Sequence, residues 1–141
     1  MVVEPLRVSD YMTEIPVTVT APMPIMAAVR LFVENDISSV IVIDANNMPI
    51  GILTERDCIR TALQSGYFDE SAGIVGDYMS TNITTVGPED SLMDVAQLFA
   101  DSPFRRCPVV SEGRLVGMIS RRNVLRALTE TTWFPEPPPK S

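Results

Sequence analysis

Hydrophobic and polar positions follow the same order twice along this chain, and this predicts two copies of one structural unit. In each copy a β-branched stretch, residues 17–19 or 84–86, predicts a strand. Apolar residues at helical spacing then predict a helix that begins near residue 25 or residue 92. The continuous apolar run at residues 40–43 predicts a strand that is buried on both faces.

Each copy continues with a polar turn, a return strand and a closing helix. In the first copy these are residues 44–47, 49–53 and 55–64. The second copy has the same order, with a strand at 107–110, a turn at 111–114, a strand at 115–119 and a helix at 121–129. The order in each copy is β-α-β-β-α, so the predicted fold class is α/β.

The first helix of each copy has an apolar face. We expect that face to comprise Ile25, Val29, Phe32 and Val33 in the first copy and Leu92, Val95, Ala96 and Phe99 in the second. Pro24 stands where a first-turn proline is tolerated. Ser91 is the predicted N-cap of the second copy's helix.

Short motifs confirm the repeat at the level of single residues. The sequence Asp-Tyr-Met-Thr at residues 10–13 returns as Asp-Tyr-Met-Ser at 77–80. Residues 51–57 begin with glycine and end in Thr-Glu-Arg-Asp. They align with residues 117–123, which also begin with glycine and end in Ser-Arg-Arg-Asn. We therefore divide the chain into a first repeat (7–64), a linker (65–74), a second repeat (75–129) and a proline-rich tail (130–141).

Composition excludes several classes of function. The chain of 141 residues has a formal net charge of −7, which argues against nucleic-acid binding. It has no histidine and no glycine-rich phosphate loop, so we expect neither an enzyme nor a metal site. No apolar run is long enough to span a membrane, and no signal peptide is visible. The two cysteines, Cys58 and Cys107, make no disulfide framework, and a cytoplasmic location is expected.

Taken together, the motifs resemble the cystathionine-β-synthase (CBS) domain family. The resemblance covers residues 7–129 and rests on the duplicated Asp-Tyr-Met motif and on the duplicated Gly-apolar-apolar-Thr/Ser-x-x-Asp/Asn segment. A tandem pair of such domains is called a Bateman module. The resemblance implies two repeats packed about a pseudo-twofold axis, with two clefts that bind adenosine compounds. It also implies a homodimer that passes a signal to a partner protein.

The strongest candidate site residues are Thr54 and Asp57. From the residues alone, Thr54 caps the following helix and Asp57 favours the helix dipole. By resemblance, the Asp57 carboxylate accepts hydrogen bonds from both ribose hydroxyls, and Thr54 bonds the ribose or a phosphate. Ser120 and Asn123 match them in the second copy. An asparagine accepts one hydrogen bond without the charge, so we expect weaker ribose recognition there.

Further candidates carry positive charge or could line the clefts. By resemblance, Arg105 and Arg106 reach ligand phosphates, and we expect Arg56, Arg121 and Arg122 to join them through charge-assisted hydrogen bonds. By resemblance, Ile83, Thr84 and Phe104 line the cleft closed by Asp57, and Pro16, Val17, Ile37 and Ser38 line the cleft closed by Asn123. The alternatives are surface ion pairing for the arginines and core packing for the other residues.

The sequence therefore favours a regulatory module that senses an adenine nucleotide. The expected ligand is AMP, ADP or ATP in preference to S-adenosylmethionine, and no cofactor is required. The signal would pass through rearrangement of a homodimer or through an effector protein. The alternative is a structural dimerisation module with clefts that bind nothing.

Overall fold

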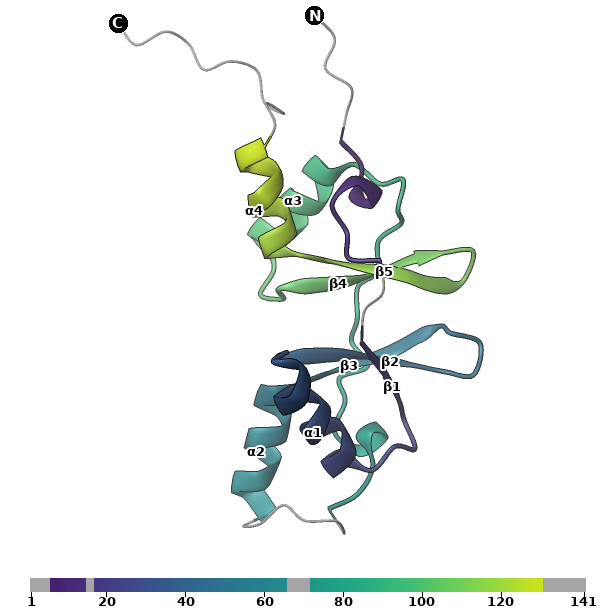
Figure 1. Cartoon of the computed structure of the whole chain (residues 1–141), viewed down its shortest axis with the longest axis vertical. Helices are drawn as coiled ribbons and strands as arrows, with labels where there is room; N and C mark the ends of the chain where they lie inside the picture. Colours follow the sequence, from purple (N-terminus) through teal and green to yellow (C-terminus); the bar gives the residue numbers. More distant parts are fainter. Residues whose placement is uncertain (1–5, 15–16, 66–71, 131–141) are drawn as a thin grey trace, which may run out of the picture. The chain divides into compact units, whose positions relative to one another are not determined.

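The computed structural model describes residues 6–14, 17–65 and 72–130 and confirms the α/β class (Figure 1). In these residues the strands form a three-stranded sheet in the order β1-β2-β3 and a two-stranded sheet, β4-β5. Each sheet belongs to one repeat. Both repeats are also preceded by a short 3-10 turn, η1 (Val8–Asp10) or η2 (Val75–Asp77).

The first repeat follows the predicted β-α-β-β-α order. Its elements are β1 (Thr18–Thr20), α1 (Ile25–Asn35), β2 (Ser39–Ile43), β3 (Pro49–Thr54) and α2 (Glu55–Ser65). Strand β1 runs parallel to β2, with Val19 opposite Val42, and β2 runs antiparallel to β3, with Val40 opposite Leu53. As predicted, the apolar run of β2 is buried at its three central residues.

One residue of the predicted buried face of α1 is wrongly assigned. Val33 is 79% exposed, whereas Ile25 and Phe32 are buried. Each helical residue turns the side chain by about 100°, so Val33 points well away from Phe32 even though it follows directly. Ala28 takes its place in the core, three residues after Ile25.

The second repeat lacks the first strand that its sequence predicts. Its elements are α3 (Leu92–Asp101), β4 (Arg106–Ser111), β5 (Arg114–Ser120) and α4 (Arg121–Glu130). Instead of a strand at 84–86, only an isolated parallel bridge joins Val86 to Val109. Pro108 stands where Ile41 stands in the first sheet, and it has no N–H to continue the pairing toward residue 84. The prediction of this strand was therefore wrong, because the proline in the neighbouring strand β4 cannot donate the next hydrogen bond.

Helix α3 buries the face that its sequence predicts. Leu92, Val95 and Phe99 are buried, and Ala96 is half-buried against the same core. Ser91 is the N-cap residue by its extended backbone, but its side chain makes no capping hydrogen bond.

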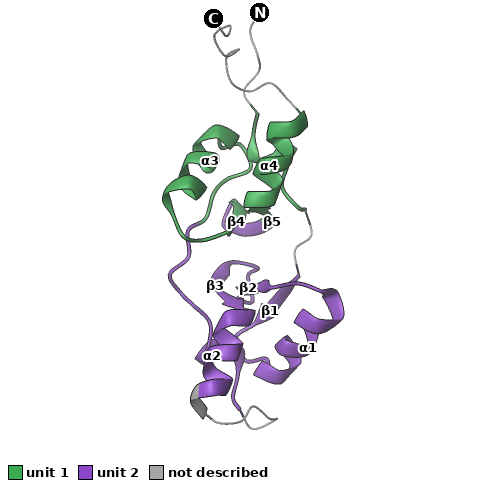
Figure 2. Cartoon of the chain, turned by 90° about the vertical axis from the view of Figure 1, so that its left-hand side faces the viewer, with its two compact units in different colours: residues 1–14, 85–111, 116–141 green, residues 15–84, 112–115 purple. Residues whose placement is uncertain are grey.

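The compact units of the structure exchange segments relative to the sequence repeats (Figure 2). Of the residues that the structure describes, those within 15–84 and 112–115 form the first-repeat unit. Those within 1–14, 85–111 and 116–141 form the second-repeat unit. The two short turns have therefore changed places: η1 belongs to the second-repeat unit and η2 to the first-repeat unit.

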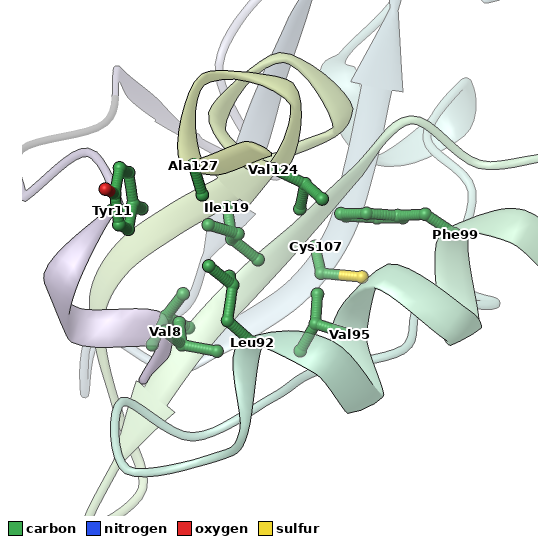
Figure 3. Packing of buried hydrophobic residues seen from close by; sticks show 10 residues of the cluster. Val8, Tyr11, Leu92, Val95, Phe99, Cys107, Ile119, Val124 and Ala127 are labelled. Carbon is green, nitrogen blue, oxygen red and sulfur yellow. The ribbon is translucent and has the colours of Figure 1, made fainter. Parts of the chain in front are cut away.

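The amino-terminal segment completes the core of the second-repeat unit. Val8 and Tyr11 are buried together with Leu92 and Ile119 (Figure 3). The Val8 N–H donates to the Asp90 carbonyl at 3.0 Å, and Thr13 forms an antiparallel bridge with Met118. This unit is thus assembled from two distant parts of the chain.

Residues 72–80 complete the first-repeat unit in the same way. Val75 is buried in its core, and the Ile25 N–H donates to the Gly73 carbonyl at 2.9 Å. Ser80 forms an antiparallel bridge with Ile52. Part of the predicted linker therefore packs in the first-repeat unit, while residues 66–71 and the tail at 131–141 lie outside the described residues.

Two equivalent glycines allow these segments to pass close to the sheets. A Cβ atom on Gly51 would lie 2.8 Å from the Met79 Sδ and 2.9 Å from the Ser80 carbonyl oxygen. On Gly117 it would lie 2.8 Å from the Met12 Sδ and 2.7 Å from the Thr13 carbonyl oxygen. In each unit, therefore, the glycine of one duplicated motif packs against the Met-Thr or Met-Ser pair of the other duplicated motif.

Candidate functional site

Thr54 and Asp57 form a reciprocal box of hydrogen bonds where strand β3 passes into helix α2. The Asp57 Oδ2 accepts hydrogen bonds from the Thr54 N–H at 3.0 Å and from the Thr54 hydroxyl at 2.8 Å. The Thr54 Oγ1 in turn accepts one from the Asp57 N–H at 3.1 Å. Two backbone N–H groups at the helix start are satisfied in this way, so the capping role predicted for Thr54 is confirmed.

The box occupies only one of the two Asp57 carboxylate oxygens. Within the described part of the chain, no hydrogen bond reaches the Asp57 Oδ1. The side chain is half-buried, and its two hydrogen bonds from Thr54 orient the carboxylate. Asp57 therefore serves the fold with Oδ2 and presents Oδ1 as a charged hydrogen-bond acceptor.

Ser120 and Asn123 repeat the same box at the start of helix α4. The Asn123 Oδ1 accepts from the Ser120 N–H at 2.8 Å and from the Ser120 hydroxyl at 2.8 Å. The Ser120 Oγ accepts from the Asn123 N–H at 3.2 Å. Because a backbone N–H can only donate, the atom that faces it must be the amide oxygen, and this fixes the orientation of the amide.

The fixed amide leaves a donor where Asp57 leaves an acceptor. The Asn123 Oδ1 already accepts two hydrogen bonds, which uses both of its lone pairs. Our expectation that this oxygen would accept a hydrogen bond from a ribose therefore does not fit the structure. The remaining polar group of Asn123 is the Nδ2 amino group, which only donates.

The arginines near these boxes differ in their hydrogen bonding and in their exposure to solvent. The Arg121 guanidinium donates to the Ser102 carbonyl at 3.0 Å, so this side chain is bound to the end of α3. Arg56, Arg105 and Arg122 are exposed, whereas Arg106 is half-buried. The sequence carried no signal for the Ser102 contact, because a backbone carbonyl acts as the acceptor.

In each repeat, a backbone hydrogen bond holds the residue that precedes β2 or β4 next to the start of the closing helix. The Glu55 N–H donates to the Ser38 carbonyl at 2.9 Å, and in the second repeat the Arg121 N–H donates to the Arg105 carbonyl at 3.0 Å. Ser38 therefore lies beside Thr54 in its own unit, and its assignment to the cleft of Asn123 stays a prediction. Arg105 occupies the equivalent place beside Ser120.

The predicted wall residues divide between the units. Val17, Ile37, Ile83 and Thr84 belong to the same unit as Thr54 and Asp57, and Phe104 belongs to the unit of Asn123. Val17 and Ile37 also pack on the core of their unit, and Phe104 meets Phe99 edge to face at 6.1 Å. Thr84 is exposed, and Pro16 lies outside the described residues. The predicted groupings that join residues of different units stay predictions.

The remaining chemistry of the described residues is limited. They contain no cluster of three or more potential metal ligands and no helix that could span a membrane. Burial raises the pKa of both the Cys58 and the Cys107 thiol to about 11, and the Asp57 charge adds to the effect on Cys58. Both thiols are therefore protonated and poor nucleophiles at neutral pH.

The closing helix of each repeat carries an exposed apolar residue that our sequence analysis did not identify. Ile59 on α2 and Leu125 on α4 are equivalent residues of the two repeats, and they are 60% and 58% exposed. The signal was present in the repeat itself, since both copies place an apolar residue on the outer side of the closing helix.

Comparison with known proteins identifies the family. The model of the CBS domain matches residues 8–63 and 75–130, which together make up most of the chain. The chain therefore belongs to the CBS-domain family and carries a tandem pair of these domains.

Several relatives and solved structures share this organisation. The chain is 34% identical over 125 residues to MJ1225 of Methanocaldococcus jannaschii, covering 89% of this chain but only 43% of that protein. It is 32% identical over 114 residues to the CBS domain-containing protein YhcV of Bacillus subtilis, covering 80% of this chain and 79% of YhcV. The chain thus spans less than half the length of MJ1225.

Among solved structures, the CBS-pair protein CBSX2 from Arabidopsis thaliana has been crystallised in complex with AMP. It matches this chain with a TM-score of 0.78 and 31% identity, covering 88% of this chain and 96% of that one. A hexameric CBS-CP12 protein from bloom-forming cyanobacteria matches with a TM-score of 0.72 and 30% identity, covering 85% of this chain and 69% of that one.

Proposed function

We propose that this chain is a non-catalytic regulatory module that binds an adenine nucleotide, with Asp57 as the residue that recognises the ribose. The observation that carries the proposal is the unused Oδ1 of Asp57, held in place by the box with Thr54. A carboxylate oxygen suits the two hydroxyls of a ribose, because both can donate to it in charge-assisted hydrogen bonds. The similarity to CBSX2, which binds AMP, supports an adenosine ligand.

The proposed ligand is AMP, ADP or ATP in preference to S-adenosylmethionine. Thr54 and Asp57 would hold the ribose, while the exposed Arg56 would reach a phosphate. The N-terminus of α2 adds a favourable field for phosphate oxygens. Ile83 and Thr84 would lie against the base. The two free cysteines agree with a reducing compartment such as the cytoplasm.

Isothermal titration with AMP, ADP, ATP and S-adenosylmethionine tests this proposal. The informative variant is Asp57→Asn, because asparagine can keep the capping box while its free end becomes a donor. The loss of a charge-assisted hydrogen bond costs about 1.5–3 kcal/mol, so we expect affinity to fall by roughly 10–100-fold. Asp94→Asn is the matched control, since Asp94 holds the same third position in α3. Equal affinity of Asp57→Asn and the parent would refute the ribose role.

We further propose that binding is reported through self-association or a partner protein. The equivalent exposed residues Ile59 and Leu125 give the closing helices of both repeats an apolar surface. Burying such side chains between two copies would remove apolar area from water. The hexameric CBS-CP12 neighbour shows that a related protein assembles. Sedimentation velocity should therefore reveal a dimer that dissociates in Ile59→Glu or Leu125→Glu.

A second candidate is a structural dimerisation module whose sites bind nothing. Asn123 favours it, because the second box lacks a free acceptor. A thermal-shift series separates the two, since a ligand at about 100 times its Kd adds roughly 2.7 kcal/mol of stability. A dimer that no adenosine compound stabilises would establish the structural module.

A further inference from the structure

The turn of the hairpin in the second repeat belongs to the first-repeat unit. Residues 112–115, which comprise this turn and the start of β5, group with residues 15–84 (Figure 2). Asn47, in the turn between β2 and β3, holds them by two hydrogen bonds. Its carbonyl accepts from the Leu115 N–H at 2.8 Å, and its Nδ2 amino group donates to the Leu115 carbonyl at 3.1 Å. One residue therefore binds both backbone groups of Leu115.

Hydrogen bonds within its own turn hold Asn47 in place. The Asp44 Oδ1 accepts from the N–H groups of Asn46 and Met48 at 2.8 and 3.0 Å. The Asp44 carbonyl accepts from the Asn47 N–H at 3.1 Å. Asn47 itself has a φ of 62°, in the left-handed region that asparagine adopts more readily than most residues. The contact with Leu115 is thus made by a turn that is ordered by its own residues.

The two repeats cannot form this contact in the opposite direction. In the alignment of the repeats Gly113 is equivalent to Asn47, and it shares a positive φ, at 75°. Pro49 is equivalent to Leu115. Glycine has no side chain that could donate, and proline has no N–H, so neither of the two hydrogen bonds can be made. The contact is therefore an asymmetric feature of an otherwise duplicated fold.

We propose that Asn47 is a latch that couples strand β5 to the first-repeat unit. Strand β3 begins two residues after Asn47 and ends at Thr54, whereas β5 begins beside the latch and ends at Ser120. A change in the first-repeat unit therefore reaches β5 through the two hydrogen bonds of Asn47. Asn47 is exposed, and two hydrogen bonds in an exposed turn open more easily than a packed core. The latch can thus open while both sheets stay folded.

Hydrogen exchange of the Leu115 amide in the full chain, without ligand, tests the latch. Asn47→Gly removes the side-chain donor, keeps the backbone carbonyl and suits the positive φ. The loss of one hydrogen bond of ordinary strength should speed the exchange of Leu115 about fivefold. Asn46→Gly is the matched control, because it makes the same change one residue earlier, and it should leave the exchange rate unchanged. Equal rates in the two variants overturn the latch.

A second pair of variants shows which unit Leu115 follows. Val19 and Val95 are each 2% exposed, in the cores of the first-repeat and second-repeat units respectively. Val19→Ala should speed Leu115 exchange about fivefold or more, because opening of the first-repeat unit releases the latch. Val95→Ala should change the rate by less than about twofold. An effect of Val95→Ala as large as that of Val19→Ala contradicts the coupling, and the Asn47 and Asn46 variants decide it if either alanine variant does not fold.

AMP tests whether the latch also carries a ligand signal, and this arm alone rests on the proposed function. Binding at Asp57 would stabilise the first-repeat unit. AMP should therefore slow the exchange of Leu115 in the parent but not in Asn47→Gly, where the latch opens locally. An equal effect of AMP on both proteins removes Asn47 from signalling. Failure of AMP to bind contradicts the proposed function instead, and the experiments without ligand still decide whether Asn47 is a latch.

Discussion

Replacing Gly117 with alanine tests the contact that joins the amino-terminal segment to the second-repeat unit. The new Cβ would lie 2.7 Å from the Thr13 carbonyl oxygen and 2.8 Å from the Met12 Sδ. The methionine side chain can rotate away, but the carbonyl belongs to the backbone. It would have to withdraw by about 0.7 Å to reach an ordinary van der Waals separation.

That withdrawal weakens a pair of backbone hydrogen bonds. The Thr13 N–H donates to the Met118 carbonyl at 2.8 Å, and the Met118 N–H donates to the Thr13 carbonyl at 2.9 Å. Overpacking a tight site costs about 1–3 kcal/mol, and each weakened bond adds up to about 1 kcal/mol. The lower entropy of unfolded alanine returns roughly 0.5–1 kcal/mol. We expect a net loss of about 1–3 kcal/mol and a Tm lower by roughly 3–10 °C.

Chemical denaturation followed by circular dichroism measures this loss. Gly87→Ala is the control, because its nearest contact, the Asp90 Oδ1, lies 3.4 Å from the new Cβ. Gly51→Ala should reproduce the loss in the first-repeat unit, where the Ser80 carbonyl oxygen lies 2.9 Å away. The reasoning is refuted if Gly117→Ala is as stable as Gly87→Ala.

Other predictions concern the box and the thiols. Thr54→Ala should lower the free energy of unfolding by about 1 kcal/mol, and Thr54→Ser should restore most of it; equal stability of both variants would contradict the capping role. Cys58 and Cys107 should react with a thiol reagent at pH 8 only after denaturation, and rapid reaction of the folded protein would contradict their burial. Because burial raises both thiol pKa values from 9.0 to about 11, stability should decline as pH rises through this interval, as the unfolded chain releases thiol protons first.

The sequence was sufficient for the elements whose pattern is local. Helix α3 and strand β2 follow from their own residues, since periodicity and an unbroken apolar run are properties of a single segment. The strand expected at 84–86 could not be judged in this way. Whether it forms depends on the donor at position 108, and proline removes that donor from another part of the chain.

In the candidate site too, some features follow from a single segment of the sequence and others depend on contacts within the folded chain. Its position at the start of the closing helices followed from the repeat, and the capping box agrees with the residue types. The orientation of the Asn123 amide could not be read from the sequence, because it depends on which atom faces the Ser120 N–H. The exchanged turns were also out of reach, since two similar turns fit either unit equally well by pattern alone.

The exchange of η1 and η2 has a consequence for how the chain acquires its structure during synthesis. Most of the first-repeat unit is continuous in sequence, from residue 15 to residue 84, so most of its contacts can form soon after that stretch leaves the ribosome. The second-repeat unit must wait, because Thr13 pairs with Met118 only after more than a hundred further residues have been made. Residues 8–13 are therefore made before the first-repeat unit but are buried only after β5 has been made.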